Sequence, residues 1–141
     1  MRQPVEEITL EEFRQLRASG GAGANKYGAK RQPVDVLDRK GRPRWADSTV
    51  EAERWGELRT LERAGEIRDL LFHPVYVLLD ARPGWPAVRY EADSSYVEAR
   101  TGARVVEDVK GGRATVTEAF KLKARLLVER YPDVTFRIEE R

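Results

Sequence analysis

Four ionisable residues of this chain have types and spacing that could support chemistry on a phosphate. Glu51 is followed at a distance by Asp93, and then by Asp108 and Lys110 with one residue between them. Carboxylate oxygens are the ligands that hard cations such as Mg²⁺ prefer. A lysine ammonium beside them can orient a water molecule or stabilise negative charge that develops on a phosphate. Three carboxylates and one lysine are therefore sufficient parts for hydrolysis of a phosphodiester.

The predicted strand Arg104 to Lys110 brings the last two of these groups together. Residues i and i+2 of a strand point to the same side, so Asp108 and Lys110 should project together at the strand's end. Gly111-Gly112 follows, and glycine allows another backbone to approach closely. An exposed Asp–Lys pair on the surface is an equally good interpretation, because Asp-x-Lys alone is a weak motif.

Asp93 lies on the polar face of a predicted strand from Val88 to Val97, in which apolar and polar residues alternate. A hairpin turn at Thr101-Gly102 can bring Asp93 beside Asp108. Facing carboxylates repel each other unless something neutralises them, and a divalent cation does this well. The alternative is that this face is simply solvated, as one face of an antiparallel sheet often is.

The third acid, Glu51, lies in a predicted helix from Ser48 to Ala64, which Ser48 caps and Gly65 ends. At about 100° per residue, Trp55 and Leu58 fall on nearly the same side as Glu51, so this side should meet the sheet. Ser48 and Glu51 also fit a capping box, in which the glutamate would serve only the start of the helix.

The remaining pattern predicts one α/β domain with a mixed central β-sheet flanked by helices. Residues 1–25 should form an N-terminal helix and a Gly-rich linker, and residues 26–141 the main domain. Short strands are also predicted at Val34 to Leu37 and at Val75 to Leu79, and the segment Ile67 to Leu71 leads into the second of these. A helix from Glu118 to Arg130 and a final strand from Val134 to Ile138 complete the domain.

Composition limits the functions that this chain can have. Its 141 residues include no cysteine, which excludes disulfides and thiol catalysis, and a single histidine, His73, which we expect to be structural or to support the site. No apolar run approaches the length of a membrane helix, so we expect a cytoplasmic protein. The net charge is only +2, so any contact with DNA must come from a local basic patch.

Several segments resemble known nucleases of the PD-(D/E)XK superfamily. The helix start Ser48-Thr49-Val50-Glu51, followed by Arg54, resembles that of archaeal-type Holliday junction resolvases. Three further segments resemble small phage and prophage endonuclease-like proteins of this superfamily. They are Tyr90-Glu91-Ala92-Asp93, Val106-Glu107-Asp108-Val109-Lys110-Gly111 and Phe120-Lys121-Leu122-Lys123. The resemblance covers roughly residues 26–136. It departs where His73-Pro74 replaces a frequent Gln-Pro, where Ser94 rather than an aromatic residue follows Asp93, and where resolvases carry glutamate in place of Asp108.

The resemblance implies a restriction-endonuclease-like core and a Mg²⁺-dependent DNA endonuclease, with Mn²⁺ as a possible substitute. The catalytic residues would be Glu51, Asp93, Asp108 and Lys110, and the three acids with the Val109 carbonyl would hold the cation. We expect contacts to DNA from a second set of residues, which comprises Lys26, Tyr27, Lys30, Arg31, Ser48, Lys121, Lys123 and Arg125.

The expected substrate is a four-way DNA junction, cleaved by a homodimer in the cytoplasm, or in the host cytoplasm if a phage encodes the protein. Two symmetric cuts suit the two-fold symmetry of a dimer. A repair, nicking or flap-processing nuclease with the same chemistry is the first alternative. A non-catalytic DNA-binding module of the same fold is the second, and the four intact ionisable residues argue against it.

Overall fold

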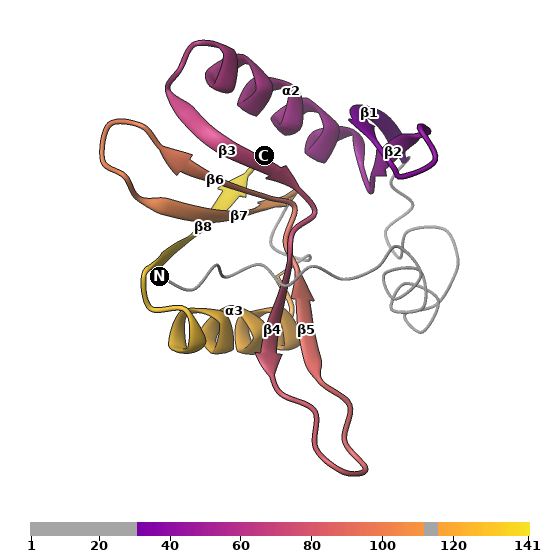
Figure 1. The fold of residues 1–141 in the computed structure, drawn as a ribbon, viewed down its shortest axis with the longest axis vertical. Helices are drawn as coiled ribbons and strands as arrows, with labels where there is room; N and C mark the ends of the chain where they lie inside the picture. Colours follow the sequence, from indigo (N-terminus) through magenta and orange to yellow (C-terminus); the bar gives the residue numbers. More distant parts are fainter. Residues whose placement is uncertain (1–30, 112–115) are drawn as a thin grey trace.

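A computed structural model describes residues 31–111 and 116–141, which form a mixed α/β fold. A central sheet lies between two helices, with α2 over one face and α3 over the other (Figure 1). The predicted N-terminal helix and linker, the domain boundary at residue 26, and Lys26, Tyr27 and Lys30 lie outside the described residues. No helix in the described ranges is long and apolar enough to cross a membrane.

The central sheet has four strands in the order β3-β6-β7-β8. Three of them form an antiparallel series, whereas β8 runs parallel to β7 and is reached through the crossover helix α3. The sheet is therefore mixed, as expected. Its strands are β3 (Ile67–Phe72), β6 (Ser94–Glu98), β7 (Arg104–Lys110) and β8 (Val134–Glu140).

Two further antiparallel pairs accompany this sheet. One pair joins β1 (Gln32–Leu37) to β2 (Pro43–Ala46), and the sequence did not predict β2 as a strand. The other joins β4 (Val75–Leu79) to β5 (Val88–Glu91) and projects from the body of the protein as a long hairpin (Figure 1).

The predicted single strand from Val88 to Val97 is wrong, because the chain breaks at Ala92 and Asp93 into β5 and β6. The facing chain breaks at the same level, between β3 and β4, where Pro74 has no N–H to donate and His73 has a left-handed φ of 51°. Two hydrogen bonds join the breaks: the His73 N–H donates to the Asp93 carbonyl and the Ala92 N–H to the Pro74 carbonyl, both at 3.0 Å. Both strands therefore bend together, with Asp93 at the bend.

The two described helices begin and end close to where the sequence predicted. Helix α2 (Thr49–Arg63) follows the cap Ser48, whose Oγ accepts a hydrogen bond from the Glu51 N–H at 3.2 Å. Helix α3 (Glu118–Arg130) follows the cap Thr117 in the same way.

The apolar core has a layer on each face of the central sheet, and a third cluster of Ala46, Trp55 and Phe72 packs α2 against β2 and β3. The larger layer lies between the sheet, β4, β5 and α3, and includes Tyr76, Val106 and Leu127. The smaller layer lies under α2 and includes Leu58 and Val105. Because side chains alternate along β7, the face of Val106 also carries Asp108 and Lys110, while the face of Val105 carries Glu107.

Two leucines of α3 offer a matched test of this packing. Leu127 is fully buried, whereas Leu122 is 61% exposed on the same helix. We expect Leu127→Ala to lower the free energy of unfolding by about 2–5 kcal/mol, because it leaves a cavity in the larger layer. Leu122→Ala should change it by less than about 0.5 kcal/mol. Urea unfolding followed by circular dichroism measures both, and equal effects would contradict the placement of α3.

Candidate functional site

A pocket of about 690 Å³ opens beside the end of β7 and gathers most of the predicted site residues. Its walls come from the start of α2, from the bend between β5 and β6, from the end of β7 and from the start of α3. The predicted residues that line it are Ser48, Glu51, Asp93, Asp108, Val109, Lys110 and Lys123.

Asp93 and Asp108 are joined by hydrogen bonds that connect the bend to β7. The Asp93 N–H donates to Asp108 Oδ1 at 3.1 Å, and the Val109 N–H donates to Asp93 Oδ2 at 2.7 Å. Ser94 faces Glu107 in the β6–β7 ladder, so Asp93 and Asp108 are the next facing positions. The prediction that the Thr101-Gly102 hairpin brings the two acids together is confirmed.

The environment of these two acids disfavours their charged forms. Burial, followed by the charges of Asp108 and Glu51, raises the pKa of Asp93 well above its usual value. Burial also raises the pKa of Asp108, although the nearby Lys110 ammonium opposes this shift. A site that holds carboxylates at this cost is suited to a cation, because a positive charge placed among them relieves both burial and repulsion.

Lys110 projects beside Asp108, as the strand spacing predicted. Its Nζ lies 3.3 Å from Asp108 Oδ2 and 4.0 Å from the centre of the Phe120 ring. The ion pair and the aromatic ring hold the ammonium group at the wall of the pocket. The interpretation of Asp108 and Lys110 as an exposed surface pair is wrong, because the Asp108 carboxylate is buried.

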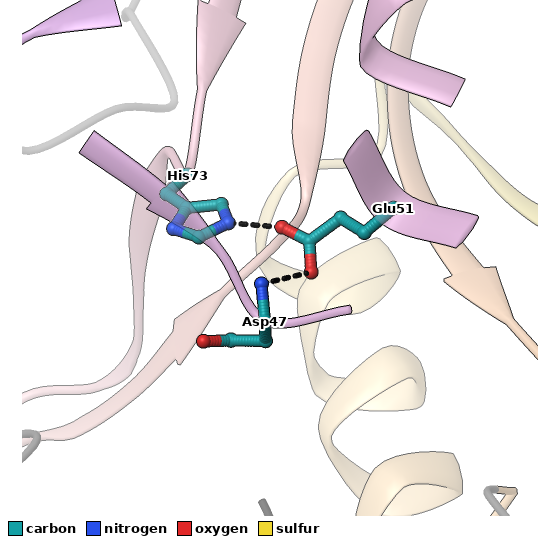
Figure 2. A group of neighbouring side chains, drawn as sticks. All are labelled: Asp47, Glu51 and His73. Atoms are coloured by element: carbon teal, nitrogen blue, oxygen red, sulfur yellow. Dashed lines mark hydrogen bonds and ion pairs between the residues drawn. The ribbon is translucent and has the colours of Figure 1, made fainter. Parts of the chain in front are cut away.

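Glu51 is buried at the start of α2 and uses both carboxylate oxygens (Figure 2). Oε2 accepts a hydrogen bond from the Asp47 N–H at 3.0 Å, and Oε1 is bonded to His73 Nε2. The capping box is therefore only partly formed. Ser48 caps the helix, but the Glu51 side chain reaches the residue before the cap and the histidine of the bend.

His73 connects two glutamates at the bend. Its Nδ1 lies 2.9 Å from Glu91 Oε1, while Nε2 bonds Glu51, and its ring stacks on Phe72 with 3.8 Å between ring centres. Burial lowers the pKa of His73, but the hydrogen bonds to Glu51 and Glu91 outweigh it and raise the pKa to about 9. His73 is therefore an imidazolium at neutral pH in the absence of metal, and it supports Glu51 directly.

Asp47, Glu51 and His73 form a compact group that could hold a metal ion. Each offers one ligand atom, and within the described ranges these three atoms lie within 4.8 Å of one another (Figure 2). Asp93 and Asp108 line the pocket together with Asp47 and Glu51, but they are not members of this group. The sequence pattern did not indicate Asp47 or Glu91 as site residues. An acid directly before a helix cap was the available signal for Asp47.

The predicted DNA-binding residues that the structure describes do not all face the pocket. Lys123 lines it, and so does Ser48, whose hydroxyl caps α2. On the exposed side of α3, Lys121 pairs with Glu118 at 3.1 Å and Arg125 with Glu129 at 2.5 Å. Arg31 is exposed just before β1.

The shifted pKa of His73 predicts how stability depends on pH. Its value of about 9 in the folded chain is above the ordinary 6.5, so the stabilisation is complete below pH 6.5 and is lost as pH rises through 9. Urea unfolding in chelator, between about pH 6 and about pH 10, should show this fall. His73→Gln should remove the part of the fall that lies in this window. An identical pH profile in the variant would contradict the assignment.

Comparison with known protein families identifies the family of this chain. A family model described as "Protein of unknown function (DUF1064)" matches residues 24–140, which is most of the chain and includes every described residue of the pocket. No curated protein and no solved structure matches the sequence. On the extent of this match, the chain belongs to the DUF1064 family.

Proposed function

We propose that this protein is a metal-dependent DNA endonuclease. The observation that carries the proposal is the convergence of Glu51, Asp93, Asp108 and Lys110 on one open pocket. These residues come from α2, the β5–β6 bend and β7, so only the folded chain assembles them. Three carboxylates with an ammonium group match the needs of phosphodiester hydrolysis, which are cation binding, water activation and charge stabilisation.

The donor set of the pocket fits Mg²⁺. The three acids offer hard oxygen ligands, and the raised pKa values of Asp93 and Asp108 indicate a place where negative charge lacks sufficient compensation. Glu51, Asp93, Asp108 and the Val109 carbonyl would hold the ion, with Mn²⁺ as a substitute. When bound, the cation would polarise the scissile phosphate and lower the pKa of a water molecule.

Lys110 is the residue that would act on the reacting groups directly. Its ammonium group lies at the pocket wall between Asp108 and the Phe120 ring, within reach of a phosphate that enters the pocket. There it would orient the attacking water or stabilise negative charge on the phosphate. Lys123, from the same wall, would bind a neighbouring phosphate.

A four-way DNA junction is the substrate that we propose, with a homodimer as the active form. The proposal rests on the resemblance of the Ser48–Glu51 helix start to that of resolvases, and of the Val106-to-Gly111 segment to phage endonuclease-like proteins. A nuclease that acts on flaps or nicked duplexes would use the same pocket, so substrate assays must separate the two. Either activity would operate in the cytoplasm, where the DNA of a bacterium or an infecting phage is found.

Removing one carboxylate should separate catalysis from binding. Asp108→Asn should reduce cleavage in Mg²⁺ at least about a hundredfold, because the pocket loses a charge that serves the transition state. DNA binding should be unchanged or tighter, because one source of repulsion for phosphate is gone. Cleavage gels and fluorescence anisotropy measure the two properties.

Glu53 provides the matched control, because it is an exposed glutamate on the same helix as Glu51. Glu53→Gln should cleave like the parent chain, whereas Glu51→Gln should not. Cleavage that continues in excess chelator would refute the metal-dependent mechanism.

Substrate shape should matter more than charge if the protein is a resolvase. We expect binding to a four-way junction to persist as salt rises, whereas binding to linear duplex of the same arms should fade, because non-specific contacts are mostly to phosphates. Anisotropy titrations at increasing salt, with light scattering to determine the oligomeric state, measure this. A monomer with equal affinity for both DNAs would favour the general nuclease.

A further inference from the structure

We propose that Asp47, Glu51 and His73 form a second metal position, which takes a transition-metal ion such as Mn²⁺ in preference to Mg²⁺. This position would share Glu51 with the all-oxygen position at Asp93 and Asp108. The neighbouring position at Asp93 and Asp108 rests on the proposed function. The second position, at Asp47, Glu51 and His73, does not depend on it.

The ligand atoms of this group already converge. The Asp47 carboxylate, the Glu51 carboxylate and the His73 imidazole each place one ligand atom within 4.8 Å of the others, and Figure 2 shows the three residues side by side. Two of the three ligands are buried, and Asp47 is half-buried at the pocket edge. Ligand atoms that surround one ion must lie about this close, so small side-chain shifts are sufficient to admit a metal.

Contacts to the backbone and to the ring of His73 hold this residue in place. His73 has a left-handed φ of 51°, which is uncommon for a residue with a side chain. Its N–H donates to the Asp93 carbonyl at 3.0 Å, its ring stacks on Phe72, and Pro74 follows it. Uncommon backbone conformations that neighbouring contacts maintain are concentrated at functional sites. These contacts aim Nε2 at Glu51.

Glu91 gives this histidine the partner that metal-binding histidines usually have. A ligating histidine donates its other ring N–H to a carboxylate or a carbonyl, which fixes the tautomer and makes the ligand more basic. Here Glu91 Oε1 lies 2.9 Å from Nδ1, on the opposite side of the ring from Glu51. A metal at Nε2 would replace the proton that His73 and Glu51 share, and that proton would leave to solvent.

The nitrogen ligand separates the two positions chemically. Imidazole suits transition metals, whereas Mg²⁺ prefers oxygen ligands and keeps its waters. The acids Asp93 and Asp108 offer only oxygen, so Mg²⁺ should favour their position. The group with His73 offers one nitrogen and two carboxylates, so Mn²⁺ should favour it.

Binding of Mn²⁺ to the full chain, measured by isothermal titration calorimetry and by electron paramagnetic resonance, tests the proposal without DNA. We expect two Mn²⁺ per chain, with excess Mg²⁺ displacing only one of them. His73→Gln should lose the Mg²⁺-resistant ion, although its amide can still hydrogen-bond Glu51. Glu91→Gln should weaken that ion about 10- to 100-fold, as loss of a supporting carboxylate does elsewhere.

Three further variants make the result decisive. Asp47→Asn should weaken the same ion, which covers the case that His73→Gln does not fold, and Glu53→Gln should leave both ions unchanged. Undiminished Mg²⁺-resistant Mn²⁺ binding in folded His73→Gln or Asp47→Asn would overturn the second position. Asp108→Asn should lose the Mg²⁺-sensitive ion only. If Asp108→Asn keeps that ion and still cleaves DNA, the proposed role of Asp108 fails. If the parent chain binds Mn²⁺ but cleaves no DNA, the proposed function fails, while the histidine variants still decide the second position.

Discussion

The repulsion among carboxylates at the end of β7 is the constraint on which the rest of the site depends. Two backbone hydrogen bonds hold Asp93 and Asp108 together. The Asp93 N–H donates to the Asp108 carboxylate, and the Val109 N–H donates to the Asp93 carboxylate. Burial raises the pKa of both acids, and the charges of Asp108 and Glu51 raise that of Asp93 further, whereas Lys110 lowers that of Asp108. A cation of the kind proposed above would relieve this cost, because it places a positive charge among the acids.

Glu107, the residue before Asp108 in β7, is a carboxylate whose negative charge is neutralised within the protein. Glu107 points to the opposite face and is fully buried, but Arg54 binds it through two hydrogen bonds of 3.0 and 2.9 Å and the Tyr96 hydroxyl donates to it at 3.1 Å. This set satisfies the charge of Glu107 within the protein. Asp108, one residue further along, faces the open pocket instead. The alternation of the strand therefore separates a structural acid from a candidate catalytic one.

The paired break in the strands is the second requirement of the site. If β3 ran straight into β4, and β5 into β6, neither His73 nor Asp93 would lie at a bend. Pro74 interrupts one strand, and the bonds between the two breaks keep them at one level. The same bend brings Glu51 of α2 against His73 and thereby joins the helix to the sheet. This bend thus places His73 against Glu51 and Asp93 beside Asp108.

The sequence by itself determined the local features of this protein: both described helices with their caps, strand β7, and the shared side of Asp108 and Lys110. Each depends on residues a few positions apart, for which side-chain periodicity and capping chemistry are sufficient. Only the tertiary structure decided the division of β5 from β6, the strand β2, and the roles of Asp47, His73 and Glu91. Those features depend on contacts between distant segments, such as the 22 positions that separate Glu51 from His73. A local sequence pattern cannot predict such a contact. Which groups become buried beside one another, and which charges interact, depends on how the whole chain folds.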